Sequence, residues 1–369
     1  MPTVGLAMIV KDEALTLPRL AASLAGQLDH WTIVDTGSSD GTQSVAREVF
    51  AAVPGRVIED EWRGYGPSRN VALEAATAES DWVLTLDADD TLHGEVDRGE
   101  LDGALDGLDA EYRYAELRWW VPRLLKSSAG WEWRGRAHEY LCIPGRERRL
   151  AHLKSFYVEH HGDGGNRGGK VARELGLLRQ DWDEGVDAVR TSFYLARTLE
   201  DAGDPAEAAA WYRRRIELGG WAEETWYARW RLGRCLLATG ALHEACGLLW
   251  STWADRPWRP EPLWSLAEHY RLQAKWEPGW QACSAAMRCC GVEPFRSEDD
   301  APIGNSDVLF VHADVWQWRI AYETSIAAWY VDEWPIGLRA LDHVLAQRDL
   351  PEELRSNVTA NRRFYTSGS

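Results

Sequence analysis

Residues 82–90 read WVLTLDADD, an apolar run that ends in an acidic turn. An uninterrupted apolar run of this kind is typical of a strand covered on both faces of a parallel sheet. Similar runs stand at residues 4–10 (VGLAMIV) and 31–34 (WTIV), with a shorter one at 56–58 (RVI). Stretches with helical periodicity separate these runs, so the N-terminal part is predicted to be an α/β domain with a largely parallel, Rossmann-like sheet.

Two acidic turns follow strands of this predicted sheet, at residues 35–42 (DTGSSDGT) and 87–90 (DADD). Ligands of open parallel sheets bind beyond the carboxyl ends of the strands, so both turns are expected at a ligand site. Asp87 and Asp89 could share a hard divalent cation with a diphosphate, and the cation would neutralise the leaving group. Acidic caps after strands are also common, so this pair alone is a weak signal.

Four short motifs occur in order over the first 90 residues: MIVKDE (8–13), VDTGSSDGT (34–42), SRNVAL (68–73) and LDADD (86–90). In these motifs the chain resembles the family-two inverting glycosyltransferases, which have the GT-A fold. The resemblance covers the half of such enzymes that binds the nucleotide-sugar donor. It implies a GT-A-like domain, a nucleotide-sugar donor, and a place for Ile9 against that donor.

The resemblance also implies roles for single side chains. Asp35 would contact the base and ribose, and Arg69 would lie near the nucleotide. Asp87 would bind ribose or diphosphate, and Asp89 would bind the metal, manganese or else magnesium. Thr36 stands where many members carry a second aspartate, so the family pattern supports the metal contact more fully than the base contact. The alternatives are a turn-forming role for Asp35 and a solvated helix-end position for Arg69.

Glu139 ends the segment WEWRGRAHE at residues 131–139 and is the candidate general base. Inverting transfer requires a group that takes the acceptor's proton as the nucleophile attacks. The segment is similar to a Gly-x-x-His-Glu element in family members that carry tetratricopeptide repeats. The alternative is that Glu139 only pairs with Arg134, Arg136 or another nearby arginine.

A histidine pair, His160-His161, follows a short apolar run at residues 156–158. A histidine at a strand end could supply a further metal ligand, and related transferases often have one. His161, next to the glycine-rich stretch 162–169, is the predicted ligand, although such a pair is also compatible with simple packing.

From residue 171 the pattern indicates helices only. Small residues recur in three segments at intervals of about 34 to 37 residues, close to the tetratricopeptide period; they are Ala196, Gly203 and Ala208, then Gly233, Gly240 and Ala245, then Ala267, Ala274 and Gly279. A weaker fourth copy starts at Ser325, with Gly337 in the packing position. We predict a GT-A domain over residues 1–165 and an all-α tetratricopeptide-like domain over residues 171–369.

Composition excludes some function classes. A formal net charge of −17 and a pI near 5.1 disfavour nucleic acid as a partner. Six cysteines without a CxxC spacing favour a reducing compartment. No apolar run reaches the length of a membrane span, and the start lacks the basic region of a signal peptide. The expectation is a soluble, cytoplasmic protein with no membrane span.

Together these features predict a metal-dependent inverting glycosyltransferase that uses a UDP-sugar. The helical part favours a peptide or protein acceptor. Most tryptophans are expected in the core between helices, and some of those in this part are expected as exposed anchors on a concave face (Trp226, Trp230, Trp250, Trp253, Trp258 and Trp264). The alternative acceptors are a glycan, a lipid-linked sugar or a small metabolite, with the repeats mediating homo-oligomerisation. A non-catalytic repeat scaffold is a further alternative. A sugar-nucleotide synthesiser is disfavoured because residues 11–15 (KDEAL) contain no glycine.

Overall fold

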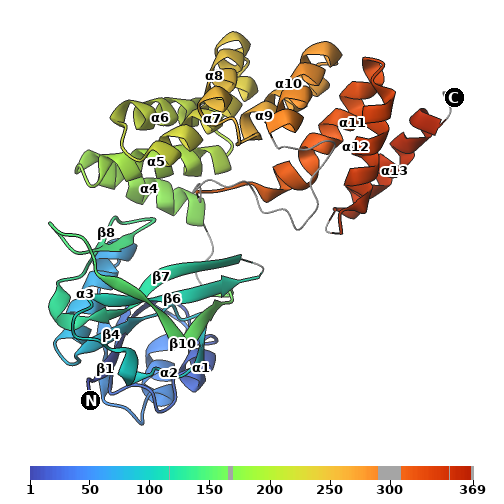
Figure 1. Cartoon of the computed structure of the whole chain (residues 1–369). Coiled ribbons are helices and arrows are strands. Elements are labelled where there is room, and N and C mark those ends of the chain that lie inside the picture. The colour runs from blue at the N-terminus through green and yellow to red at the C-terminus, as the bar shows by residue number, and fades with distance from the viewer. Residues whose placement is uncertain (116, 165–168, 290–308, 349, 367–369) are drawn as a thin grey trace. The chain divides into compact units, whose positions relative to one another are not determined.

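The computed structural model describes residues 1–115, 117–164, 169–289, 309–348 and 350–366 (Figure 1). The chain forms two compact units, Met1–Thr191 and Ser192–Ser369, each of which is described by itself. In the described part of the chain, no helix is both long enough and apolar enough to cross a membrane.

The first unit is built on an eight-stranded sheet with the strand order β3-β2-β1-β4-β7-β6-β10-β5. Its parallel half contains β1 (Val4–Val10), β2 (His30–Asp35), β3 (Gly55–Glu59) and β4 (Trp82–Thr85). The connecting helices are α1 (Leu17–Ser23), α2 (Thr42–Val49) and α3 (Tyr65–Thr77). The α/β sheet and the crossover helices predicted from the sequence are confirmed.

The other half of the sheet is mixed. Strands β6 (Gly107–Tyr114) and β7 (Leu117–Lys126) form a hairpin, and β7 pairs antiparallel with β4. Strand β10 (Leu150–His160) lies parallel to β6 and antiparallel to β5 (Asp90–Gly94) at the far edge. The chain that leaves β4 therefore crosses β7, β6 and β10 before it forms β5, and the DADD turn makes this crossing.

The continuous apolar run of β1 is explained by helices on both faces of the sheet. Leu6 and Met8 pack in one core with Leu17 and Leu20 of α1. Ala7, which points to the opposite face, packs in a second core with residues of α3. In Figure 1 the sheet lies between α3 on one face and α1 on the other. Burial on both faces fixes the direction in which each strand end points, and so positions the acidic turns.

Short elements complete the first unit. They are η1 (Arg98–Glu100), η2 (Ser127–Ala129), the two-stranded ribbon β8 (Glu132–Arg134) with β9 (Tyr140–Cys142), and α4 (Lys170–Asp183). Helix α5 (Ala188–Asp201) begins in this unit. Helix α4 starts close to the expected domain division at 165–171, whereas the compact unit continues to Thr191; the division itself stays a prediction.

The second unit consists of successive helices: α6 (Pro205–Leu218), α7 (Ala222–Ala238), α8 (Leu242–Asp255), α9 (Glu261–Leu272), α10 (Trp276–Cys289), η3 (Val315–Arg319), α11 (Ile320–Tyr330), α12 (Trp334–Ala346) and α13 (Glu352–Thr366). Gly203, Gly240 and Ala274 all have positive φ, as a tight turn between paired helices requires. A Cβ on Gly233 would lie 2.5 Å from the Leu249 side chain, so that glycine allows α7 and α8 to approach. The tetratricopeptide-like pattern is confirmed.

The six tryptophans considered as anchors differ in burial. Trp226, Trp230 and Trp264 are buried, which makes the anchor interpretation wrong for these three. Trp250, Trp253 and Trp258 are partly buried. The sequence pattern could not separate the two roles, because a tryptophan between paired helices and one on their surface have the same spacing.

Candidate active site

A cavity of about 430 Å³ lies where the carboxyl ends of the parallel strands meet. It is bordered by the end of β1, the DADD turn, the loop before β9, the end of β10 and the start of α4. The lining includes the predicted residues Ile9, Arg69, Asp87, Asp89 and Glu139, which come from distant parts of the chain.

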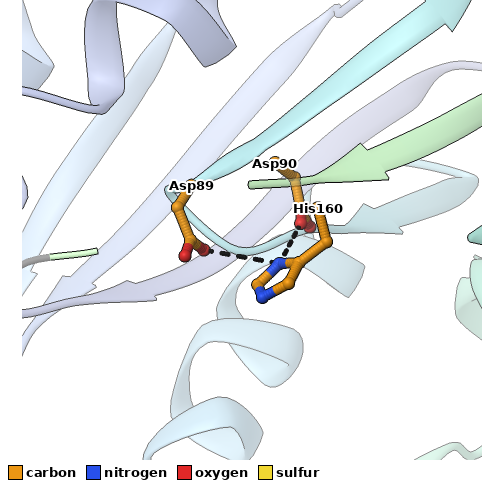
Figure 2. A group of neighbouring side chains, drawn as sticks. All are labelled: Asp89, Asp90 and His160. Atoms are coloured by element: carbon orange, nitrogen blue, oxygen red, sulfur yellow. Dashed lines mark hydrogen bonds and ion pairs between the residues drawn. The ribbon is translucent and has the colours of Figure 1, made fainter. Parts of the chain in front are cut away.

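The last residue of the DADD turn, Asp90, is fully buried and holds the turn in place. Its Oδ2 accepts hydrogen bonds from the Asp87 backbone N–H (2.8 Å) and the Tyr112 hydroxyl (2.7 Å). Its Oδ1 lies 2.9 Å from Nδ1 of His160, and that nitrogen is 3.7 Å from Oδ1 of Asp89 (Figure 2). Asp90 therefore fixes both the backbone of the turn and the imidazole that faces it.

Asp89, Asp90 and His160 place one ligand atom each within 4.8 Å of one another, which fits a divalent cation. Carboxylate oxygens with an imidazole suit Mn²⁺ and other hard to borderline ions. Burial raises the pKa of Asp89, and the neighbouring carboxylates of Asp87 and Asp90 add to this effect. A cation would offset this concentration of negative charge, so the residues present fit a metal.

In the structure, the predicted metal ligand His161 contacts Thr91 rather than the acidic side chains of the turn. Its Nε2 lies 2.9 Å from the Thr91 hydroxyl, and its backbone N–H donates to the Asp89 carbonyl at 3.1 Å. Successive side chains of a strand point to opposite faces. Because β10 pairs His160 with Asp90, the imidazole of His160 is the one that reaches the acidic turn.

Arg69, from α3, bridges the acidic turn and the candidate base. Its Nη2 donates to Oδ1 of Asp87 at 2.6 Å, and its Nε donates to Oε1 of Glu139 at 2.9 Å. Burial would lower the pKa of Arg69, but the two carboxylates outweigh it and raise the pKa. Burial would likewise raise the pKa of Asp87, and Arg69 and Arg123 instead hold it well below its usual range. The Asp87 carboxylate is therefore held ionised beside the cavity.

This bridge bears on the alternatives stated above for Arg69 and Glu139. The Arg69 side chain is 11% exposed, so it is not a solvated helix-end cation. Glu139 does pair with an arginine, but the partner is Arg69. Arg134 pairs with Glu132 instead, and Arg136 pairs with carboxylates of α4 and the turn after it.

A match to a known family covers the N-terminal part of the chain. Residues 6–110 match the model of glycosyl transferase family 2. The N-terminal domain is a family 2 glycosyltransferase domain. A TPR repeat-containing protein of Synechococcus elongatus is 43% identical over 93 residues, which are 25% of this chain and 22% of that protein. An uncharacterised glycosyltransferase of Rickettsia felis is 30% identical over 96 residues, 26% of this chain and 32% of that protein.

Among solved structures, S. aureus TarS 1–349 in complex with UDP aligns with 80% of this chain and 94% of that chain, at 14% identity and a TM-score of 0.37. The chain spans only about a fifth to a third of the length of these curated relatives.

The first acidic turn of the glycosyltransferase domain is arranged around Asp35. Its Oδ1 accepts from the backbone N–H groups of Gly37 and Ser38, both at 2.8 Å, so it does form the turn. Its Oδ2 is buried and has no hydrogen-bond partner among the described residues. The cavity lining includes Thr36 but, in the described part of the chain, not Asp35. The contact between Asp35 and the base therefore stays a prediction.

The loop that carries Glu139 joins β8 to β9 and is held by hydrogen bonds on two sides. On the α3 side, the Asn70 side chain exchanges two hydrogen bonds with the Trp133 backbone (2.7 and 2.8 Å), and the Tyr65 N–H donates to the Arg136 carbonyl at 2.7 Å. A Cβ on Gly66 would lie 2.1 Å from the carbonyl oxygen of Gly135. Helix α3 and this loop are thus in backbone contact.

On the other side, α4 and the residues after it hold the same loop. The carboxylate of Asp181 accepts from the backbone N–H and the guanidinium of Arg136, both at 2.6 Å. The Tyr140 hydroxyl donates to Asp187 at 2.7 Å, and Arg190 Nε donates to the His138 carbonyl at 3.0 Å. Sequence reasoning missed these supports and the roles of His160, Asp90 and Asn70, although Asn70 stands in SRNVAL and Asp90 in LDADD.

Proposed function

We propose that this chain is a metal-dependent, inverting glycosyltransferase that transfers a sugar from a UDP-sugar to a peptide or protein side chain. The observation that carries the proposal is the single cavity lined by Ile9, Arg69, Asp87, Asp89 and Glu139. Strand ends, an acidic turn and a carboxylate from a separate loop converge there. This arrangement supports donor binding on one side and proton removal on the other.

In this proposal Asp89 and His160 hold the divalent cation, with Asp90 as the neighbouring carboxylate that contacts the same imidazole nitrogen. A cation at this place would stabilise the negative charge that develops on the departing diphosphate. Asp87 binds the ribose side of the donor, and Asp35, which shapes the first acidic turn, contacts the base or ribose. The assignment of His161 as ligand gives way to His160 because only the latter's ring faces Asp89.

The transfer itself is a single displacement. A hydroxyl or thiol of the acceptor forms its bond to the anomeric carbon as the bond from that carbon to the diphosphate oxygen breaks. Glu139 takes the proton of the attacking group. Arg69 holds Glu139 and Asp87 at a fixed separation, so the base and the donor side of the site are positioned by one side chain. Such preorganisation avoids reorientation at the moment of reaction.

The first test is hydrolysis of a panel of UDP-sugars by the full chain, with release of UDP measured with and without Mn²⁺. We expect Mn²⁺-dependent hydrolysis of at least one donor, and its loss in Asp89→Asn. Asp102→Asn, an exposed change in the same unit, is the matched control and should not alter the rate. A wild-type chain that neither hydrolyses nor binds any nucleotide sugar would support the repeat-scaffold alternative instead.

The acceptor class rests on the helical unit, whose tetratricopeptide-like repeats are suited to extended polypeptides. A glycan, lipid-linked sugar or small metabolite is the competing acceptor. The two are separated by supplying peptides and free sugars together with the donor that the enzyme hydrolyses. Preferential labelling of the free sugars would contradict the peptide proposal.

A further inference from the structure

The β6–β7 hairpin extends past the end of β4, on the side of the sheet where the cavity lies. Strand β4 pairs with β7 only at Leu124–Lys126. For Leu117–Val121, the strand pairing in the described part of the chain is with β6 alone. One edge of β7 therefore leaves backbone N–H and C=O groups without a strand partner just beyond the DADD turn.

One face of this hairpin contacts residues of the candidate active site. Tyr112 and Trp119 are cross-strand partners with ring centroids 5.8 Å apart, and the Tyr112 hydroxyl donates to Asp90. Tyr114, two residues further along the same face, has its ring 5.5 Å from that of His160. Leu117 is the cross-strand partner of Tyr114 and shares that face. Tyr114, Leu117 and Trp119 together are named the hairpin strip.

The hairpin strip is strongly exposed for such large apolar side chains. Tyr114 is 44% exposed, Leu117 63% and Trp119 38%, whereas Tyr112 on the same face is buried. A contiguous set of exposed apolar side chains beside a reaction site indicates a surface that is covered when a partner binds. The strip borders His160 and Gly162, which line the cavity, so the two surfaces are continuous.

The opposite face of the hairpin has a different environment. Trp120 lies with its ring 4.2 Å from that of His152, and the guanidinium of Arg113 lies 3.5 Å from the Tyr157 ring centre. Trp120 is 45% exposed, about as much as Trp119, but it points away from the DADD turn. The chain therefore offers two tryptophans that are neighbours in sequence, similar in exposure, and different in the face they occupy.

We propose that the hairpin strip and the open edge of β7 bind an extended segment of a polypeptide acceptor. The proposal rests on the transferase function above and states where its acceptor lies. An open strand edge offers hydrogen-bonding groups in the register of a peptide backbone, and side chains at alternate positions give the bound strand its specificity. A glycan lacks the regularly spaced amide N–H and C=O groups that would pair with that edge.

The experiment compares Trp119→Ser with Trp120→Ser in the full chain. The donor is the UDP-sugar that the wild type hydrolyses with Mn²⁺. The acceptor probes are short synthetic peptides with a central Ser, Thr or Cys and apolar residues at alternate positions, scrambled peptides of the same composition, and a methyl glycoside. The measured quantity is the ratio of transfer to donor hydrolysis, together with KM for the peptide. Leu117→Ser serves as a second strip variant if Trp119→Ser melts early.

We expect the ratio to fall about tenfold or more in the strip variants, mainly through KM, and to change little in Trp120→Ser. The alternating peptides should be labelled in preference to the scrambled ones. Equal effects of both tryptophan changes, or none, would overturn the assignment of the strip. Labelling of the methyl glycoside but of no peptide would overturn the polypeptide as occupant. A wild-type chain without any donor hydrolysis would instead contradict the transferase function itself.

Discussion

Gly66→Ala tests whether the contact between α3 and the loop of Glu139 sets the geometry of the site. Gly66 lies in the first turn of α3 and is buried. In an open helix, alanine in place of glycine stabilises by up to about 1 kcal/mol. Here the added Cβ would lie 2.1 Å from the carbonyl oxygen of Gly135, and the neighbour is backbone, which has no rotamer to change. The helix or the loop must move.

The magnitude follows from the overlap. Overpacking of this kind costs about 1–3 kcal/mol, which exceeds the propensity gain, so we expect a net loss of stability of about 1–2 kcal/mol. A shift of about 1 Å in a positioned group lowers turnover by about a hundredfold. Gly135 is four residues before Glu139, so the shift reaches the base. The larger effect is therefore expected on catalysis rather than on folding.

The assay pairs thermal unfolding with Mn²⁺-dependent donor hydrolysis. Gly176→Ala is the matched control, because Gly176 lies within α4 and a Cβ there would meet nothing within 4 Å. The control should be as stable as the wild type or slightly more so, with an unchanged rate. If Gly66→Ala behaves like this control in both measurements, the contact is not tight and the positioning argument is wrong.

Three further outcomes are expected. Glu139→Gln keeps the size of the side chain but accepts no proton, so turnover should fall by about 10²–10⁴ while titration calorimetry shows unchanged UDP binding; near-normal turnover would leave Glu139 with only its ion pair to Arg69. Asp89→Ala should abolish the response of donor hydrolysis to Mn²⁺ added after chelation, and an intact response would remove Asp89 from the metal site. Burial, together with nearby arginines such as Arg231, lowers the pKa of His312 to about 4. The unfolded chain therefore binds this proton first, and denaturant titrations should show wild-type stability falling more steeply than that of His312→Gln between pH 6.5 and pH 4; parallel curves would contradict this.

The sequence predicted those parts of the fold that depend on local pattern. The apolar runs at 4–10, 31–34 and 82–86 coincide with β1, β2 and β4 because both faces of these strands are covered. It did not predict that β10 would lie between β6 and β5. That placement depends on pairing between segments far apart in the chain, which leaves no local signal.

The same limit applies within the site. The acidic turn and Arg69 were predicted because short motifs carry them, and the structure brings them together. Which of His160 and His161 reaches the acidic turn depends on the direction of each side chain at the end of β10. That is fixed by the pairing of β10 with β5, and a shift of one residue would exchange the two. Glu139 pairs with Arg69, which is 70 positions away in the chain. Proximity in the sequence pointed to Arg134 and Arg136 instead.

The supports of the Glu139 loop bear on how the protein can be cut and recombined. A fragment that ends at the glycine-rich stretch keeps the loop of Glu139 but loses Asp181, Asp187 and Arg190. Arg136 would then keep its charge beside the site without the buried carboxylate that receives it, and the loop would lose its second wall. The smallest portable unit with an intact site therefore extends to Thr191. Grafting the glycosyltransferase domain onto another repeat array would have to carry α4 along as part of that domain.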